Sequence, residues 1–193
     1  MTLTPHDLIG YVERDLDADI ARWFPAGEPV EVPAGTRSID HLLDRLPPAG
    51  AVALAGFDRR VREGRIPWPF DIADWSYGFD FAANGCTILD ADHETGLGDG
   101  DVFTIGADGG CNLWTVLADG QVAVWFHEEE VLEGGTRFEH LDVFLWSLVR
   151  YHAVRAGVLS RADVEADFRS LGQDGALAED VGLLAGMRDS SPA

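Results

Sequence analysis

The chain has 193 residues, 46% of them hydrophobic and 10% aromatic, enough for one domain that buries roughly 70% of its unfolded surface. No apolar run approaches the roughly 18 residues of a membrane span, and the N-terminus lacks the basic start and apolar core of a signal peptide. We therefore expect a cytoplasmic protein without membrane contact. All 14 basic residues are arginines, which excludes mechanisms that need a lysine, such as a Schiff base or a phosphate-loop lysine.

Acidic residues are concentrated in the middle of the chain. The formal net charge is −20, and the span from Ile66 to Thr136 holds 14 acids and no arginine. Such a field repels nucleic acid and attracts a basic protein, with an association rate that falls as salt rises. The same charge would also serve simply to keep the protein in solution, and both interpretations stay open.

The N-terminal part is predicted to be mainly helical. Thr4 and Pro5 form a good helix start, and the apolar residues after them keep helical spacing. We expect a helix over residues 5–23, a short edge strand over Val30–Val32, a short helix from Ser38 that Pro47-Pro48 ends, and a strand over Ala51–Phe57. The last segment also fits a helix, because small and apolar residues suit either structure, and we favour the strand.

The only cluster of basic residues follows this segment. It consists of four arginines within seven positions: Arg59, Arg60, Arg62 and Arg65. Such a cluster could grip phosphate, but balancing the neighbouring acids explains it as well, and we expect no nucleic-acid partner.

The centre of the chain is predicted to be an antiparallel meander. Its strands are expected over Val102–Ile105, Leu113–Leu117 and Val122–Phe126. Turns that contain glycine separate them, and Asp119-Gly120 suits a tight two-residue hairpin.

Helices are expected on both sides of this meander. Before it, a helix or broken helix over Asp71–Ala83 should stop at Asn84-Gly85, and a short strand should follow over Thr87–Leu89. After it, Thr136 and Glu139 form a capping box for the best helix in the chain, which should end near Gly157 and lie across the sheet. Further helices are expected within residues 160–187, the first of them started by Ser160 and Asp163.

The acidic loop before the meander resembles the start of a calcium loop. Asp90, Asp92 and Glu94 alternate as the oxygen ligands of such a loop do. The match fails at the sixth position, where Thr95 replaces the glycine of the sharp turn, and flanking helices are missing. We therefore expect a solvated turn, and we predict no metal and no cofactor.

Catalytic patterns are incomplete. His127 and the glutamates after it lack the second histidine of a zinc-protease helix, because Val131 stands in its place. Cys86 and Cys111 are too few for a disulfide framework and are expected as unpaired thiols. A cysteine nucleophile paired with a histidine stays open, since such partners meet only in the fold. The glycines of Gly106–Gly110 indicate a turn or bulge rather than a phosphate cradle.

A family resemblance runs through the same region. Its residues are Phe103–Gly110, Leu113-Trp114, Val122–Trp125, the helix from Phe138, and, upstream, Ile66-Pro67 and Asn84-Gly85. Together, over about residues 36–155, they resemble the SUKH superfamily, which includes yeast regulators of cell-wall glucan synthesis and bacterial immunity proteins that neutralise secreted toxins. Cys111 departs from the family pattern, in which a further glycine is common. Residues 1–35 and 160–193 lie outside the resemblance.

We predict an α+β fold with an antiparallel sheet of about four to six strands and helices packed on one side and at the ends. A single domain should span residues 1–193, with a core at about 36–157, an N-terminal helix at 5–23 and a C-terminal helical extension at 160–187.

The resemblance implies a non-enzymatic protein that blocks a basic toxin, such as a nuclease, through an acidic surface. That surface would comprise Asp90, Asp92, Glu94, Asp99, Asp101, Glu128, Glu129 and Glu130. Trp125 would add an aromatic anchor, although a strand tryptophan more often belongs to the core. The alternatives are a regulatory or scaffold module that binds a cellular protein, and a small hydrolase that uses Cys86 or Cys111 with a histidine. The oligomeric state is not predicted.

Overall fold

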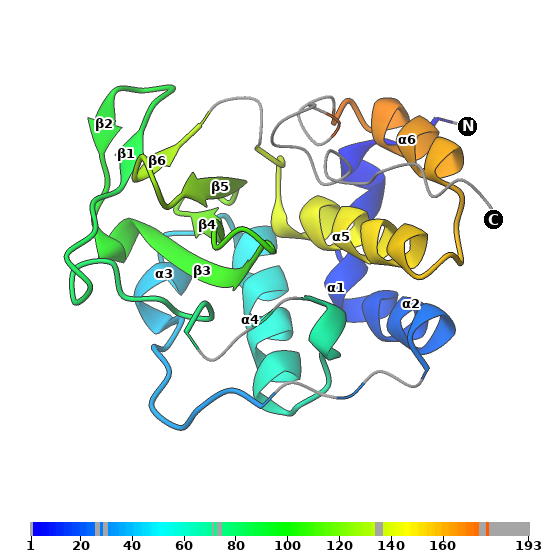
Figure 1. Cartoon of the computed structure of the whole chain (residues 1–193), viewed down its shortest axis with the longest axis horizontal. Helices are drawn as coiled ribbons and strands as arrows, with labels where there is room; N and C mark the ends of the chain where they lie inside the picture. Colours follow the sequence, from blue (N-terminus) through cyan, green and yellow to red (C-terminus); the bar gives the residue numbers. More distant parts are fainter. Residues whose placement is uncertain are drawn as a thin grey trace.

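The computed structural model describes residues 2–25, 28, 31–70, 72, 75–133, 137–173 and 177. Figure 1 shows a sheet beside a group of helices, with the longest helices crossing near the middle of the molecule. The helices are η1 (Pro5–Leu8), α1 (Tyr11–Arg14), α2 (Leu16–Trp23), α3 (Asp40–Leu43), α4 (Pro48–Arg62), η2 (Trp68–Phe70), η3 (Asp99–Asp101), α5 (Leu141–Arg155) and α6 (Arg161–Ser170). Among these described helices, none has the length and apolar character to cross a membrane.

The sheet is mixed and mostly antiparallel. Its strands are β1 (Leu89–Asp90), β2 (Thr95–Gly96), β3 (Val102–Ala107), β4 (Leu113–Leu117), β5 (Val122–Phe126) and β6 (Val131–Leu132). Their order is β2-β1-β6-β5-β4-β3, and β1 pairs with β6 in parallel. The α+β fold expected from the sequence is confirmed, with the parallel pair as the departure from a purely antiparallel sheet.

The predicted meander is confirmed as β3, β4 and β5, but its second turn has a different geometry. Leu117 donates its N–H to the carbonyl of Gln121 at 2.9 Å, and Gly120 donates its N–H to the carbonyl of Leu117 at 2.9 Å. The loop therefore has three residues rather than two. Gly120 has a φ of 91°, as a bulge after a type I turn requires.

The sheet is buried on both faces. On the helix side, Phe103 and Trp114 belong to the main core, which they share with α1, α2, α4 and α5. On the other side, Trp125 packs in a smaller core with Phe81 and Ile88, from the segment that precedes β1. Because both faces are covered, every residue of β3 and β4 is buried, instead of every second one.

Helix α5 organises the helical part of the molecule. It contacts α1, α2, α4 and α6 (Figure 1). Asp142 in its first turn is 3% exposed and accepts hydrogen bonds from the N–H groups of Gly10 at 2.8 Å and Val12 at 2.9 Å. These bonds attach the N-terminal segment to α5.

The bounds of α5 differ from the prediction at its N-terminal end. Phe138 is extended and forms a bridge with Val122, so the helix cannot include it. His140 caps the helix instead of the predicted capping box, because its ring accepts the N–H of Val143 at 3.4 Å. Thr136 lies outside the described residues. The predicted end near Gly157 is confirmed by its φ of 71°.

The strand predicted over Ala51–Phe57 is wrong. These residues form the middle of α4, a helix of 15 residues that begins at Pro48. A proline in the first turn lacks only an N–H that has no helical partner, so Pro48 suits the start of this helix. The previous helix, α3, already ends at Leu43, before the two prolines that were predicted to end it. The short apolar run suited both structures, and the core shared with α1 and α5 decides for the helix.

The helix predicted over Asp71–Ala83 is also wrong for its described part, residues 72 and 75–83. Tyr77 forms an antiparallel bridge with Ile105, which covers the edge of β3. Asn84-Gly85 still marks a turn, and Gly85 has a φ of 72°. Covering an edge strand in this way prevents its pairing with another chain.

The terminal elements agree with the sequence only in part. The predicted helix over 5–23 is broken into η1, α1 and α2, because Gly10 adopts a φ of 83° and Asp15 interrupts the next turn. Helix α6 begins as predicted, with Ser160 Oγ accepting the N–H of Asp163 at 3.1 Å. Of the predicted edge strand over Val30–Val32, Val30 lies outside the described residues, and Glu31 and Val32 form no strand. The predicted helical extension from 178 to 187 also lies outside the described residues.

Candidate functional site

Two of the eight predicted interface acids are paired with one arginine. Arg137 contacts Asp90 at 2.5 Å and Asp92 at 2.9 Å. Burial would raise the pKa of Asp90, but hydrogen bonds from Arg137 and His93 outweigh it and hold that pKa below its usual range. The resemblance to a calcium loop ends here, because an arginine neutralises two of the three carboxylates.

Asp99 serves the fold in a similar way. Its carboxylate accepts the N–H groups of Phe81 at 2.9 Å and Ala82 at 3.0 Å, and it lies 3.5 Å from Nη1 of Arg37. These contacts attach the segment that covers the outer face of the sheet.

Asp101 is likewise held within the chain. It accepts the N–H of Gly98 at 2.7 Å and pairs with Arg45 at 2.5 Å. The hydrogen bond from Gly98, with Arg45 beside it, lowers the pKa of Asp101. The arginines that pair with this acidic span, Arg37, Arg45 and Arg137, therefore come from outside it.

Glu130 also has a structural role. Its carboxylate accepts the N–H of Thr87 at 2.8 Å and the hydroxyl of Thr87 at 2.5 Å. These bonds lower the pKa of Glu130, and the residue has a φ of 57° in the turn between β5 and β6.

Four predicted acids are exposed, and apart from Asp92, which pairs with Arg137, they are Glu94, Glu128 and Glu129. In the described part of the chain, no hydrogen bond or ion pair joins these three glutamates to another residue. Glu94 lies in the turn after β1, whereas Glu128 and Glu129 lie in the turn before β6. Because β1 and β6 run parallel, these two turns lie at opposite ends of the strand pair. The structure thus brings Glu128 and Glu129 together and separates them from Glu94.

The glycine-rich turn between β3 and β4 lies at the same end of the sheet as Glu128. Asp108 accepts the N–H groups of Gly110 at 2.7 Å and Asn112 at 2.9 Å. A carboxylate of the chain therefore occupies the donors that a phosphate would need. Asn112 in turn accepts the N–H of His127 at 3.2 Å, which joins this turn to the one that carries Glu128.

Neither cysteine has the surroundings of a nucleophile. Cys111 is exposed and Cys86 is partly buried. Burial, together with Glu130, raises the pKa of Cys86, which disfavours the reactive thiolate. Within the described residues, no hydrogen bond links either thiol to a histidine, and no group of three or more potential ligands could hold a metal ion.

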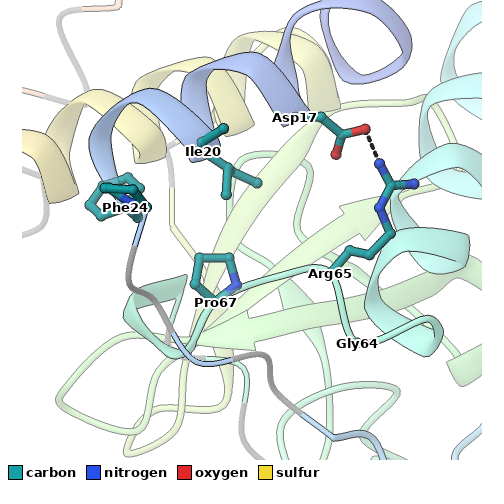
Figure 2. A pocket seen from close by; sticks show the side chains of 8 residues that line it. Asp17, Ile20, Phe24, Gly64, Arg65 and Pro67 are labelled. Atoms are coloured by element: carbon teal, nitrogen blue, oxygen red, sulfur yellow. Dashed lines mark hydrogen bonds and ion pairs between the residues drawn. The ribbon is translucent and has the colours of Figure 1, made fainter.

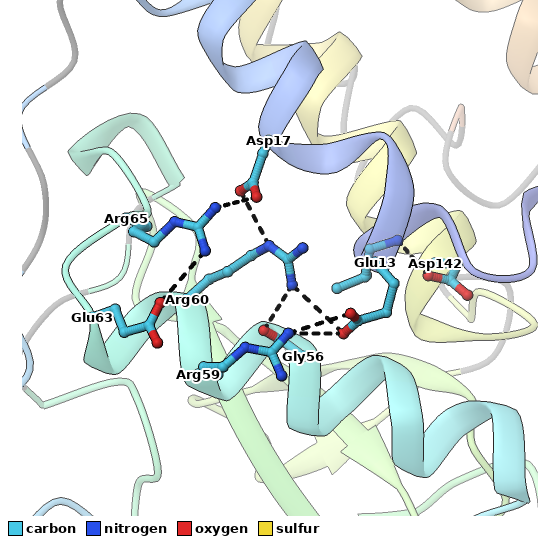
Figure 3. A network of polar contacts seen from close by, with 9 residues as sticks. Glu13, Asp17, Gly56, Arg59, Arg60, Glu63, Arg65 and Asp142 are labelled. Atoms are coloured by element: carbon cyan, nitrogen blue, oxygen red, sulfur yellow. Dashed lines mark hydrogen bonds and ion pairs between the residues drawn. The ribbon is translucent and has the colours of Figure 1, made fainter.

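The predicted arginine cluster is directed at the chain itself (Figure 3). Arg60 is 4% exposed and lies 3.1 Å from Asp17 and 3.7 Å from Glu13. Arg59 pairs with Glu13 at 3.2 Å, and Arg65 pairs with Asp17. These three arginines join α4 and the residues after it to the N-terminal helices, whereas Arg62 pairs with Asp58 within α4 at 2.9 Å.

Trp125 belongs to the core, as a strand tryptophan usually does. It is 3% exposed, donates its indole N–H to the carbonyl of Thr87 at 3.1 Å, and packs edge-on against Phe81 at 4.9 Å between ring centroids. It does not act as an exposed anchor.

A cleft that the sequence did not indicate lies between α2 and the chain after α4 (Figure 2). It has a volume of about 390 Å³ and apolar walls formed by Ile20, Phe24 and Pro67. Arg65 and Asp17 pair with one another across its mouth, so its charged groups are already satisfied.

A second hollow region lies between the start of α4 and the residues around Ile9. Two adjoining hollows of about 210 and 280 Å³ share Ile9, Ala49, Ala53 and Asp142 in their walls. No pattern in the sequence indicated this hollow region, because its walls come from distant segments.

Comparison with known proteins gives no relative: no family model, no curated protein and no solved structure matches this chain.

Proposed function

We propose that this chain is a non-enzymatic protein-binding domain, similar to SUKH immunity proteins, that neutralises a basic toxin in the cytoplasm. The observation that carries the proposal is the exposed pair Glu128 and Glu129 on the turn before β6. Their neighbours Glu130 and Asp108 hold backbone N–H groups, whereas these two carboxylates have no such task among the described residues.

The charge of the whole chain supports a basic partner. The formal net charge is −20, and the arginines nearest to the acidic span are engaged with Asp90, Asp99 and Asp101. These arginines therefore do not neutralise the negative charge of the turn that carries Glu128, and this charge can attract a basic partner. Nuclease toxins present basic surfaces, and complementary charge raises the association rate more than the final affinity.

The proposal is tested by measuring the association rate of this protein with a basic toxin domain that is encoded next to its own gene. Changing Glu128→Gln and Glu129→Gln together should lower the association rate about 3- to 10-fold at low salt, with little effect on dissociation. The difference should vanish at high salt, because mobile ions screen exposed charges.

The matched control removes the same charge elsewhere, through Glu94→Gln and Asp44→Asn. Both side chains are exposed, and Glu94 lies at the opposite end of the β1–β6 pair. Equal association rates for the two double variants would contradict the role of Glu128 and Glu129. If co-expression of this protein does not protect cells from the toxin that the neighbouring gene encodes, the proposed immunity function is wrong.

A further inference from the structure

We propose that the groove formed by the two adjoining hollows docks a segment of another protein that carries an apolar side chain next to arginine or lysine. The groove is bounded by Ile9, the first two turns of α4, the start of α5 and the β4–β5 turn. This surface lies at the opposite end of β5 from Glu128, so the inference does not depend on the proposed function.

The floor of the groove is apolar and open to solvent. Ile9 is 42% exposed and Val52 is 58% exposed. Pro47, Pro48 and Ala49 beside them are exposed as well. Aliphatic side chains gathered in one hollow favour burial by a partner, unlike single exposed residues scattered over a surface.

Glycine makes the groove deeper. Gly50 in the wall carries no side chain, and the atoms nearest to an added Cβ, from Leu46 and Pro47, would lie at an ordinary 3.8 Å. Proline rings with fixed φ stiffen the wall on this side, so little conformational freedom would be lost on binding.

The rim of the groove is acidic. Glu13, Asp119, Glu139 and Asp142 line it, and no arginine does so among the residues that form its walls. Glu13 is already paired with Arg59, and Asp142 holds the N–H groups of the N-terminal segment. Asp119 uses one oxygen for the N–H of Gln121, and Glu139 is exposed without a contact in the described residues.

The histidine in the wall is engaged within the chain. Nε2 of His140 lies 3.1 Å from the carbonyl of Pro5, and Nδ1 accepts the N–H of Val143 at 3.4 Å. Both ring nitrogens therefore have partners in the protein.

Charge complementarity indicates which kind of segment the groove binds. Asp119 and Glu139 present negative charge beside an apolar floor, which suits an aliphatic or aromatic side chain followed by a guanidinium or ammonium group. Nucleic acid and anionic lipid carry the wrong sign for this rim. A second copy of the chain is disfavoured because each copy has a formal net charge of −20.

A random peptide library displayed on phage tests this without knowledge of the natural partner. The wild-type chain should enrich peptides in which a large apolar residue lies close to arginine or lysine. Binding of the enriched peptides should fall at least about tenfold in Val52→Glu, which puts a charge on the floor, and several-fold in Glu139→Gln.

The control variant is Val158→Glu, which introduces the same charge at a position that is 52% exposed and outside the groove. It should bind the peptides as the wild type does, and thermal unfolding should show that all three variants are folded. Failure to enrich any peptide, or peptides that bind Val52→Glu and wild type equally, would overturn the proposal. Enriched peptides without a basic residue would overturn the assigned partner chemistry.

Discussion

Replacing Gly56 by alanine is expected to destabilise the protein, although alanine is normally the better residue inside a helix. Gly56 lies in the interior of α4, where the change by itself would favour alanine by about 0.5–1 kcal/mol. A Cβ at this position would lie 1.9 Å from Oε1 of Glu13. The side chain of Glu13 must therefore move away.

The cost of that movement follows from the ion pairs of Glu13 (Figure 3). Its contact with Arg59 at 3.2 Å is exposed to solvent and is worth at most about 1 kcal/mol. Its contact at 3.7 Å with Arg60 matters more, because Arg60 is 4% exposed and its charge needs partners. Arg60 keeps Asp17 and the carbonyl of Gly56, so we expect a loss of about 1–2 kcal/mol.

The net effect should be a destabilisation of about 1 kcal/mol, or about 2–4 °C in Tm. Urea and thermal unfolding of Gly56→Ala, Glu13→Ala and the double variant measure it as a cycle. With Glu13 removed, the nearest remaining atom named at this site is Nη1 of Arg60, at 3.3 Å, which must shift only slightly. Gly56→Ala should therefore no longer destabilise the protein in this background, and the helix preference of alanine sets an upper limit of about 0.5–1 kcal/mol on the gain.

Gly50→Ala is the control in the same helix, since its Cβ would meet its nearest neighbours at an ordinary 3.8 Å. It should not destabilise the protein in either background. If Gly56→Ala has the same effect with and without Glu13, the steric reasoning is refuted.

Two further predictions concern buried polar groups in α5. Burial lowers the pKa of His152 to about 3, so between about pH 6.5 and that value the unfolded chain binds a proton that the folded chain does not. The free energy of unfolding should therefore fall by about 1.4 kcal/mol per unit as the pH drops through this window, and His152→Leu should flatten that slope in urea titrations at pH 6.5 and 4.5. Ser147 is fully buried and its hydroxyl has no hydrogen-bond partner among the described residues. Ser147→Ala should therefore raise the free energy of unfolding by about 0.5–1 kcal/mol, and a clear loss of stability would contradict this reasoning.

Local sequence signals predicted much of the fold. The strands at Leu113–Leu117 and Val122–Phe126 have the predicted bounds, because β-branched and aromatic runs between glycine turns act within a few residues. The start of α6 at Ser160 and the end of α5 near Gly157 were also predicted from signals within a few residues. The strand predicted over Ala51–Phe57 failed because a short apolar run does not reveal whether a sheet or other helices will cover it.

The predicted acidic interface shows that composition does not reveal which acidic side chains are paired in the folded protein. Counting charge placed a strongly negative span at the centre of the chain, and the sequence by itself determined that excess. It did not reveal that Arg37, Arg45 and Arg137 return from distant positions to pair with Asp99, Asp101 and Asp90. Ion pairs and hydrogen bonds act over a few ångströms, so folding alone decided which carboxylates became structural and left Glu128 and Glu129 exposed.

For the groove beside Ile9, too, the sequence determined one part and the tertiary structure decided the other. The sequence determined which residue types are present there: prolines and alanines before and within α4, and acids in the neighbouring turns. Only the tertiary structure assembled them, because its walls come from the residues after η1, from α1, α4 and α5, and from the β4–β5 turn. Propensity and periodicity act along the chain, whereas a cavity depends on how elements far apart in sequence pack against one another.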